Sequence, residues 1–222
     1  MPLLLTQDDL RPLVDGPRFP RDAFAVIEHA LRREHGADLG HALFLKFPLG
    51  AEDRAVQVYP LSSPLHGCFV RVSPVSEGPR PTADANLALH LDRETGEALA
   101  LIATDDLSPL RTAAPVGVAC RHLAPAGARI LALIGSGLQA RYQARAIQAA
   151  VPTLDTVRVF SPTPAHRERF AREMGERTGL SILAVDAARD AVEGADIVCV
   201  TAGGAPRSSR RPGSGRARSS PR

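Results

Sequence analysis

A glycine-rich turn in the middle of the chain has the residue types and spacing that bind a pyrophosphate. Five apolar residues, Ile130–Ile134, run directly into Gly135, and Gly137 follows after one residue. An Ala- and Gln-rich segment without further Gly or Pro then extends to Ala150. Such a strand, turn and helix present backbone N–H groups and the positive end of the helix dipole to an anion, and the missing Cβ atoms let a pyrophosphate approach the main chain. We expect five residues of this turn to bind a dinucleotide: Gly135, Ser136, Gly137, Leu138 and Gln139.

The glycine pattern is weak by itself, because such a turn can exist only to let a helix pack closely. Its third glycine is replaced by Ala140, which the dinucleotide fingerprint allows. The following segments strengthen the prediction, since strands and helices alternate: strands at Thr156–Phe160, Leu180–Val185 and Ala195–Thr201, helices at Pro164–Gly179 and Ala187–Glu193. This alternation implies right-handed crossovers and a Rossmann-like parallel sheet. The alternative is an α/β domain with an empty loop.

The first half of the chain has a different texture, with short apolar strands broken by Pro and Gly. The expected strands are Ala42–Phe47, Ala55–Tyr59, Cys68–Val72, Ala85–Leu91 and Ala98–Ile102, with a hairpin loop at Asp92–Glu97. Expected helices are a turn capped by Thr6, a second helix from Pro20 to His35, and a connecting helix from Thr104 to Ala124. We therefore predict an α+β domain with antiparallel strands over residues 1–113, before a partial Rossmann dinucleotide-binding domain over 114–202.

The net charge of +3 is misleading, because it comes from the end of the chain. Residues 203–222 carry six arginines and no acid, so residues 1–202 alone carry −3. This argues against a generic basic nucleic-acid-binding surface for the folded part, although the tail could be a basic arm. The tail has no periodicity and no large apolar residue, so we expect it to be disordered.

The spacing of the cysteines and the hydropathy of the chain indicate where in the cell the protein works. Cys68, Cys120 and Cys199 lie far apart without metal-type spacing, so we expect them to be buried, reduced side chains. No apolar run approaches the roughly 20 residues that span a bilayer, and no signal-like segment follows Met1. These features predict a cytoplasmic protein with no membrane partner and no metal site.

An arginine in the connecting helix has the chemistry of a carboxylate ligand. Arg111 stands in Leu110–Ala114, among small and apolar neighbours. A guanidinium there can offer its planar fork to a carboxylate or phosphate. The alternative is a surface arginine paired with Asp105 or Asp106.

Five blocks together resemble the ornithine cyclodeaminase/mu-crystallin family. In chain order they are Glu97–Ile102, Leu110–Ala114, Ala132–Ala140, Val157–Pro164 and Ala195–Ala202. The resemblance is strong from Leu87 to Ala202, weaker from Leu3 to Pro81, and absent after Gly203. It implies an NAD(P)(H)-dependent enzyme acting on a small amino or imino acid. Family members include cyclodeaminases that make proline from ornithine, imine reductases, and amino-acid dehydrogenases.

The resemblance also implies roles for single residues. Arg111 matches the family arginine that binds the substrate carboxylate, and Arg71 stands where the family usually has a lysine near the reacting carbon. Arginine stays protonated, so Arg71 would orient a carboxylate but would transfer protons poorly. The cofactor-binding set then includes residues outside the glycine turn: Thr82, Thr112, Ser161, Val200 and Thr201.

Two sequence features refine the implied activity. Strict cyclodeaminases have an Asp just after the fourth strand, and here Ala202 is followed by Gly203, which favours a ketimine reductase or an amino-acid dehydrogenase. Ser161 at the end of the second strand leaves room for a 2′-phosphate that Arg167 or Arg169 could face, which favours NADP(H) over NAD(H). Two alternatives are a non-catalytic NADPH-binding protein like mu-crystallin and an inactive truncated product.

The resemblance to the family stops abruptly at the end of the fourth parallel strand. Family members continue after the fourth strand with further Rossmann strands, whereas Gly203 begins the Arg- and Ser-rich tail. We expect a C-terminally truncated or frame-shifted member with an incomplete parallel sheet. By analogy with the family we also expect a homodimer formed through the antiparallel module.

Overall fold

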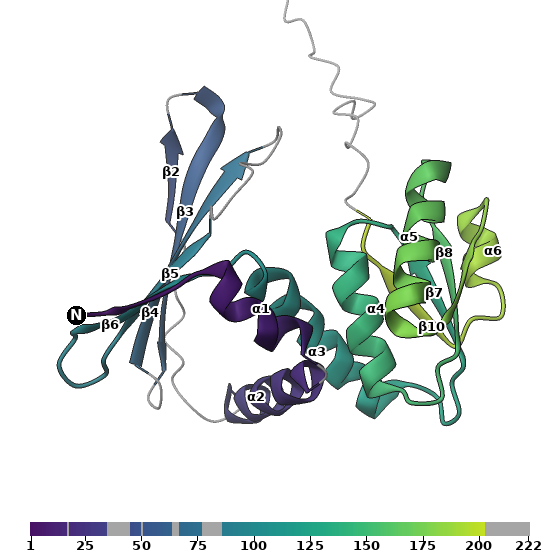
Figure 1. Cartoon of the computed structure of the whole chain (residues 1–222), viewed down its shortest axis with the longest axis horizontal. Coiled ribbons are helices and arrows are strands. Elements are labelled where there is room, and N and C mark those ends of the chain that lie inside the picture. The colour runs from purple at the N-terminus through teal and green to yellow at the C-terminus, as the bar shows by residue number, and fades with distance from the viewer. Residues whose placement is uncertain (17, 35–44, 50, 64–66, 77–85, 203–222) are drawn as a thin grey trace, which may run out of the picture.

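The computed structural model describes residues 1–16, 18–34, 45–49, 51–63, 67–76 and 86–202. These residues form two sheets with helices between them (Figure 1). Thr82 and the Arg-rich tail, about which the sequence made predictions, lie outside the described residues.

The first sheet has six strands in the order β1-β6-β5-β4-β3-β2. All neighbours are antiparallel except β1 and β6, which are parallel. The strands are β1 (Leu3–Leu5), β2 (Leu45–Leu49), β3 (Ala51–Ser63), β4 (Gly67–Ser76), β5 (Leu87–Leu91) and β6 (Ala98–Ala103). β3 and β4 pair over ten residues and so run well past the short apolar cores that the sequence pattern marked. The predicted hairpin loop is confirmed, since the Asp92 N–H donates to the Glu97 carbonyl at 2.8 Å.

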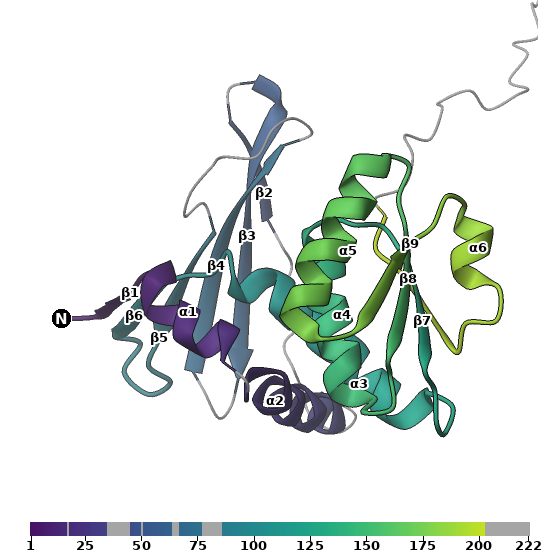
Figure 2. The same ribbon diagram turned by 45° about the vertical axis from the view of Figure 1, so that its right-hand side comes forward.

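Three helices lie on one side of this sheet: α1 (Gln7–Asp15), α2 (Phe19–Glu34) and α3 (Leu107–Leu123) (Figure 2). The predicted cap of α1 is confirmed as a complete capping box. The Asp9 N–H donates to Thr6 Oγ1 at 3.4 Å, and the Thr6 N–H donates to the Asp9 carboxylate at 2.8 Å.

The second sheet has four parallel strands in the order β10-β7-β8-β9. They are β7 (Ile130–Ile134), β8 (Thr156–Phe160), β9 (Ser181–Ala184) and β10 (Ile197–Val200). Helices α4 (Leu138–Ala150) and α5 (Pro164–Thr178) cover one face, and α6 (Ala188–Val192) lies on the other (Figure 1). The chain therefore builds outward from β7 to β9 and then returns to the other side of β7. This reversal of strand order is the place where ligands bind in open α/β sheets, at the carboxyl ends of the strands.

Helix α3 joins the two sheets. Phe24 of α2 is 1% exposed and packs in a cluster with Ala113, Ala114 and Val118 of α3 and Ala146 of α4. The predicted boundary between the two domains, at residues 113–114, falls inside α3, so one continuous helix carries residues of both halves of the chain.

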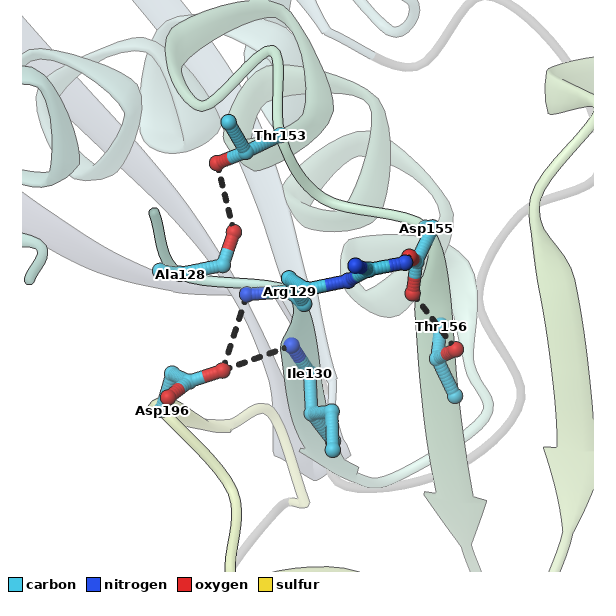
Figure 3. Close-up of polar contacts among 7 residues, drawn as sticks. All are labelled: Ala128, Arg129, Ile130, Thr153, Asp155, Thr156 and Asp196. Carbon is cyan, nitrogen blue, oxygen red and sulfur yellow. Dashed lines mark hydrogen bonds and ion pairs between the residues drawn. The ribbon is translucent and has the colours of Figure 1, made fainter. Parts of the chain in front are cut away.

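A polar cluster fixes the amino ends of the parallel strands (Figure 3). The Asp196 carboxylate accepts the backbone N–H groups of Arg129 at 2.8 Å and Ile130 at 2.9 Å. These two hydrogen bonds lower the pKa of Asp196. The Asp155 carboxylate accepts from Thr156 and Arg129, and its pKa is lowered by these contacts. The cluster lies at the amino ends of the strands, whereas the glycine turn lies at their carboxyl ends, so the role of the cluster is to hold β10 and β8 against β7.

The three cysteines are free, as expected, but each is half-buried, which corrects the expectation that they are buried. Burial raises the pKa of Cys199 to about 11, with a smaller contribution from Cys120. Cys199 lies on β10, at the edge of its sheet, so only part of its surface is covered. Within the described parts of the chain, no helix is both long and apolar enough to cross a bilayer.

Candidate functional site

Gly135 is required by the close approach of the chain after β10. Its φ is +114°, and a Cβ there would lie 2.6 Å from Thr201 Oγ1 and 2.8 Å from the Ala202 backbone nitrogen. The Gly135 N–H donates to the Phe160 carbonyl at 2.7 Å. The missing Cβ of this glycine therefore serves packing within the protein, whereas the sequence pattern gave both glycines the same role toward a ligand.

Gly137 has the opposite environment. It is the N-cap of α4 with φ −82°, it has no side-chain cap, and a Cβ built on it meets no heavy atom within 4 Å. A side chain at Gly137 would thus point into open space, and no capping side chain occupies the start of α4, so a phosphate could approach the backbone here. Ala140, at the third position of the fingerprint, is fully buried where α4 meets the sheet. The turn therefore fits a dinucleotide pyrophosphate.

The other predicted nucleotide ligands surround this turn. Ser136 Oγ and Ser161 Oγ lie 2.9 Å apart, which joins the ends of β7 and β8. Thr201 Oγ1 donates to the Ile134 carbonyl at 3.2 Å, so β10 ends against the same turn. Leu138 is 55% exposed at the start of α4, and the buried Gln139 Oε1 has no partner among the described residues. Val200 is 67% exposed.

The two predicted carboxylate ligands come from different elements and lie near each other. Arg71 is on β4 and Arg111 is on α3. Burial of Arg71, together with the neighbouring charge of Arg111, lowers the pKa of the Arg71 guanidinium. The Nε atom of Arg71 is buried and has no hydrogen-bond partner among the described residues. Two neighbouring cations with an unsatisfied buried N–H form a site that favours an anion.

A chain of side chains holds Arg71 in place. Arg71 Nη2 donates to Asn86 Oδ1 at 3.1 Å and to Ser108 Oγ at 3.0 Å. The Asn86 Nδ2 group donates to the Asp105 carboxylate, and the Asn86 backbone N–H donates to the same carboxylate at 3.1 Å. The Arg71 guanidinium also lies over the ring of Tyr59, 5.6 Å from its centroid. Asp105 thus binds Asn86, not Arg111 as the alternative from the sequence supposed.

Sequence reasoning missed this supporting set of Tyr59, Asn86, Asp105 and Ser108. Only Tyr59 had an available signal, because it pairs with Arg71 across two antiparallel strands and must share its face. Asn86 precedes β5, whereas Asp105 and Ser108 lie about twenty residues later, at the start of α3.

Thr112 links the arginine site to the nucleotide turn through its backbone. Its carbonyl accepts Gln143 Nε2 of α4 at 3.5 Å, whereas its hydroxyl donates to the Ser108 carbonyl at 3.0 Å within α3. The long contact with Gln143, together with the packing of α3 on α4, places the residue after Arg111 beside the helix that follows the glycine turn. Thr112 is one of the residues predicted to bind cofactor, and the donor of its hydroxyl is used within its own helix.

Known proteins resemble this chain in sequence and in fold. The sequence profile of the ornithine cyclodeaminase/mu-crystallin family matches residues 73–207. The chain belongs to this family. The Δ1-pyrroline-2-carboxylate reductase of Thermococcus litoralis, solved with NADH and L-proline, superposes with a TM-score of 0.75 at 27% identity over 89% of this chain and 61% of that one.

Curated sequences show the same relationship. The ornithine cyclodeaminase of Brucella abortus is 40% identical over 92 residues, which are 41% of this chain and 25% of the relative. The Δ1-pyrroline-2-carboxylate reductase of Bacillus cereus is 36% identical over 110 residues, 50% of this chain and 34% of the relative. The chain thus spans less than two thirds of the length of these family members.

Proposed function

We propose that this family member binds NAD(P)(H) and a small α-imino or α-amino acid, and that it acts as a reductase or dehydrogenase at the carbon bearing nitrogen. A bound nicotinamide supplies or accepts the hydride. The protein residues supply position: Gly137 and the first turn of α4 for the pyrophosphate, Arg71 and Arg111 for the substrate carboxylate. The similarity to a pyrroline-2-carboxylate reductase that binds NADH and L-proline supports this assignment.

The observation that carries the substrate class is the pairing of Arg71 with Arg111. A carboxylate between them would accept from the unsatisfied Arg71 Nε and offset the mutual repulsion of the two guanidinium groups. Both side chains remain protonated, so they bind and orient and do not transfer protons. The sequence places Gly203 after Ala202, and the lack of a carboxylate at that position supports reduction over cyclodeamination.

The distance between the two subsites is set by α3 and α4. Arg111 stands one residue before Thr112, whose carbonyl is bonded to Gln143 of α4. A rigid connection of this kind holds a carboxylate and a nucleotide at fixed separation, which is what hydride transfer between them needs.

The test is oxidation of NADH and of NADPH with Δ1-pyrroline-2-carboxylate, followed by absorbance. In the variant Arg111→Lys we expect KM for the imine to rise about tenfold or more, because the bidentate contact is lost, with the nucleotide Kd unchanged. Arg172→Lys, at an exposed position on α5, is the matched control. Nucleotide binding without turnover would support instead the non-catalytic binder related to mu-crystallin, and an Arg111→Lys variant with unchanged KM would remove Arg111 from the site.

We also propose that two copies associate through the face of the first sheet opposite the helices. Cross-strand register puts apolar side chains on this face, among them Val58, Val72 and Leu87, opposite in direction to Tyr59 and Arg71. Figures 1 and 2 show α1, α2 and α3 on the other side only. Light scattering after size exclusion tests this: the chain should elute as a dimer and Val72→Glu as a monomer, and a monomeric parent chain would contradict the proposal.

A further inference from the structure

The carboxyl ends of β8 and β9 bring an acid and a base to the place where a dinucleotide ribose is recognised. Val159 pairs with Ala184, and the Val185 N–H donates to the Val159 carbonyl at 3.0 Å. Continuing this register places Asp186 beside Ser161, at the end of the second strand of the Rossmann unit. In such folds an acid at the end of the second strand binds the ribose 2′-hydroxyl of NAD, and an arginine accommodates the 2′-phosphate of NADP. Here Ser161 follows the second strand, and the acid comes to its side from the end of the third strand, β9.

The arginine of this pair is already engaged. Arg167, in the second turn of α5, is 8% exposed. Its Nη1 donates to the Ser161 carbonyl at 3.0 Å, and its Nη2 forms an ion pair with the Asp186 carboxylate. Both terminal nitrogens of the guanidinium are therefore used to hold the end of β8, and Arg167 acts as a structural cation.

The acid remains open to a ligand. The side chain of Asp186 is 92% exposed, so the carboxylate keeps acceptor positions toward solvent after pairing with Arg167. A ribose hydroxyl can donate to them, whereas a doubly charged 2′-phosphate would meet an exposed negative charge. Arg169 is exposed and lies two residues beyond Arg167, about 200° around the helix at 100° per residue, so it projects from a different face of α5.

We infer that Asp186 is a specificity-determining residue. Because Arg167 is held in an ion pair and is not available to a phosphate, Asp186 makes the nucleotide site prefer NAD(H) over NADP(H). This inference rests on the proposed dinucleotide site. It reverses the preference that the sequence favoured, because that preference depended on Arg167 or Arg169 facing a phosphate.

The test is the equilibrium Kd of NADH and of NADPH for the full chain, measured by calorimetry without substrate. The parent chain should bind NADH at least tenfold more tightly than NADPH. In Asp186→Asn the ratio should shift at least tenfold toward NADPH, because the charge is removed and Arg167 Nη2 is released. Asp186→Glu keeps the charge and should keep the preference for NADH, and Asp190→Asn, at an exposed position on α6, is the matched control for loss of one carboxylate.

The outcomes separate this inference from the proposed function. Tighter binding of NADPH by the parent chain, or an unchanged ratio in a folded Asp186→Asn variant, would overturn the inference and leave the dinucleotide site standing. Failure of both nucleotides to bind a cooperatively folded parent chain would overturn the dinucleotide site and the inference together.

Discussion

Alanine substitutions at the two glycines of the turn should have opposite effects, because their environments differ. In Gly135→Ala, an L side chain takes φ +114° and its Cβ overlaps Thr201 Oγ1 and the Ala202 backbone. The backbone conformation costs about 1–3 kcal/mol and the overlap about 1–3 kcal/mol more. The expected loss of about 2–6 kcal/mol is a large part of the stability of about 5–15 kcal/mol that is typical of a folded protein.

Gly137→Ala should leave the fold almost unchanged. Its φ of −82° suits alanine, and the new Cβ meets no protein atom within 4 Å, so only the N-cap preference changes, by a few tenths of a kcal/mol. The methyl group would occupy the open space beside Gly137, where we propose that the pyrophosphate approaches the backbone, so the Kd for NADH should rise at least tenfold, which is about 1.4 kcal/mol.

Urea denaturation and calorimetry with NADH measure both effects on the same samples. The predicted pattern is lower stability for Gly135→Ala, and weaker nucleotide binding with near-parent stability for Gly137→Ala. A Gly137→Ala variant that binds NADH like the parent would show that the pyrophosphate does not use this space. A Gly135→Ala variant of unchanged stability would show that β10 does not approach the turn as described.

Three further predictions follow from other contacts. In Asp196→Asn, the free energy of unfolding from urea titrations should depend less on pH in the acid range. The pKa of Asp196 is lowered in the folded state, so its stabilising contribution is present above the ordinary pKa of 3.8 and is lost as the pH falls below it. An identical pH profile in the variant would refute this. Asn86→Ala should release Arg71 and raise KM for the imine about tenfold or more with no change in NADH affinity, whereas an unchanged KM would exclude a positioning role. Gly117→Ala places a Cβ 2.2 Å from the Phe24 ring and should cost about 1–3 kcal/mol in thermal denaturation; equal melting temperatures would contradict the packing of α2 on α3.

The parallel half of the fold could be predicted because its signals are local. Thr156–Phe160 was predicted as a strand with the bounds that β8 has, and Pro164 and Gly179 mark the start and the cap of α5. Each apolar run is short and bounded by turn residues, so periodicity and breakers suffice even for β9 and β10, which are partly exposed.

The arginine site could be predicted only in part. Arg111 could be singled out by its small and apolar neighbours, whereas Arg71 came only from the resemblance, and in the structure Arg71 contacts Ser108, one turn before Arg111 on α3. Asn86 and Asp105 could not be found, since each is a single polar residue whose partner is fixed by pairing of distant strands. The same limit applies to Arg167: its position on α5 was predictable, but its ion pair with Asp186 depends on the register of β8 and β9.

A crystal structure of the chain with NADH and L-proline would show directly whether the glycine turn and the two arginines form one site. We expect pyrophosphate oxygens within about 2.7–3.2 Å of the backbone nitrogens at the start of α4, and the proline carboxylate between Arg71 and Arg111. A nucleotide bound elsewhere on the protein, or a carboxylate that touches neither arginine, would contradict it.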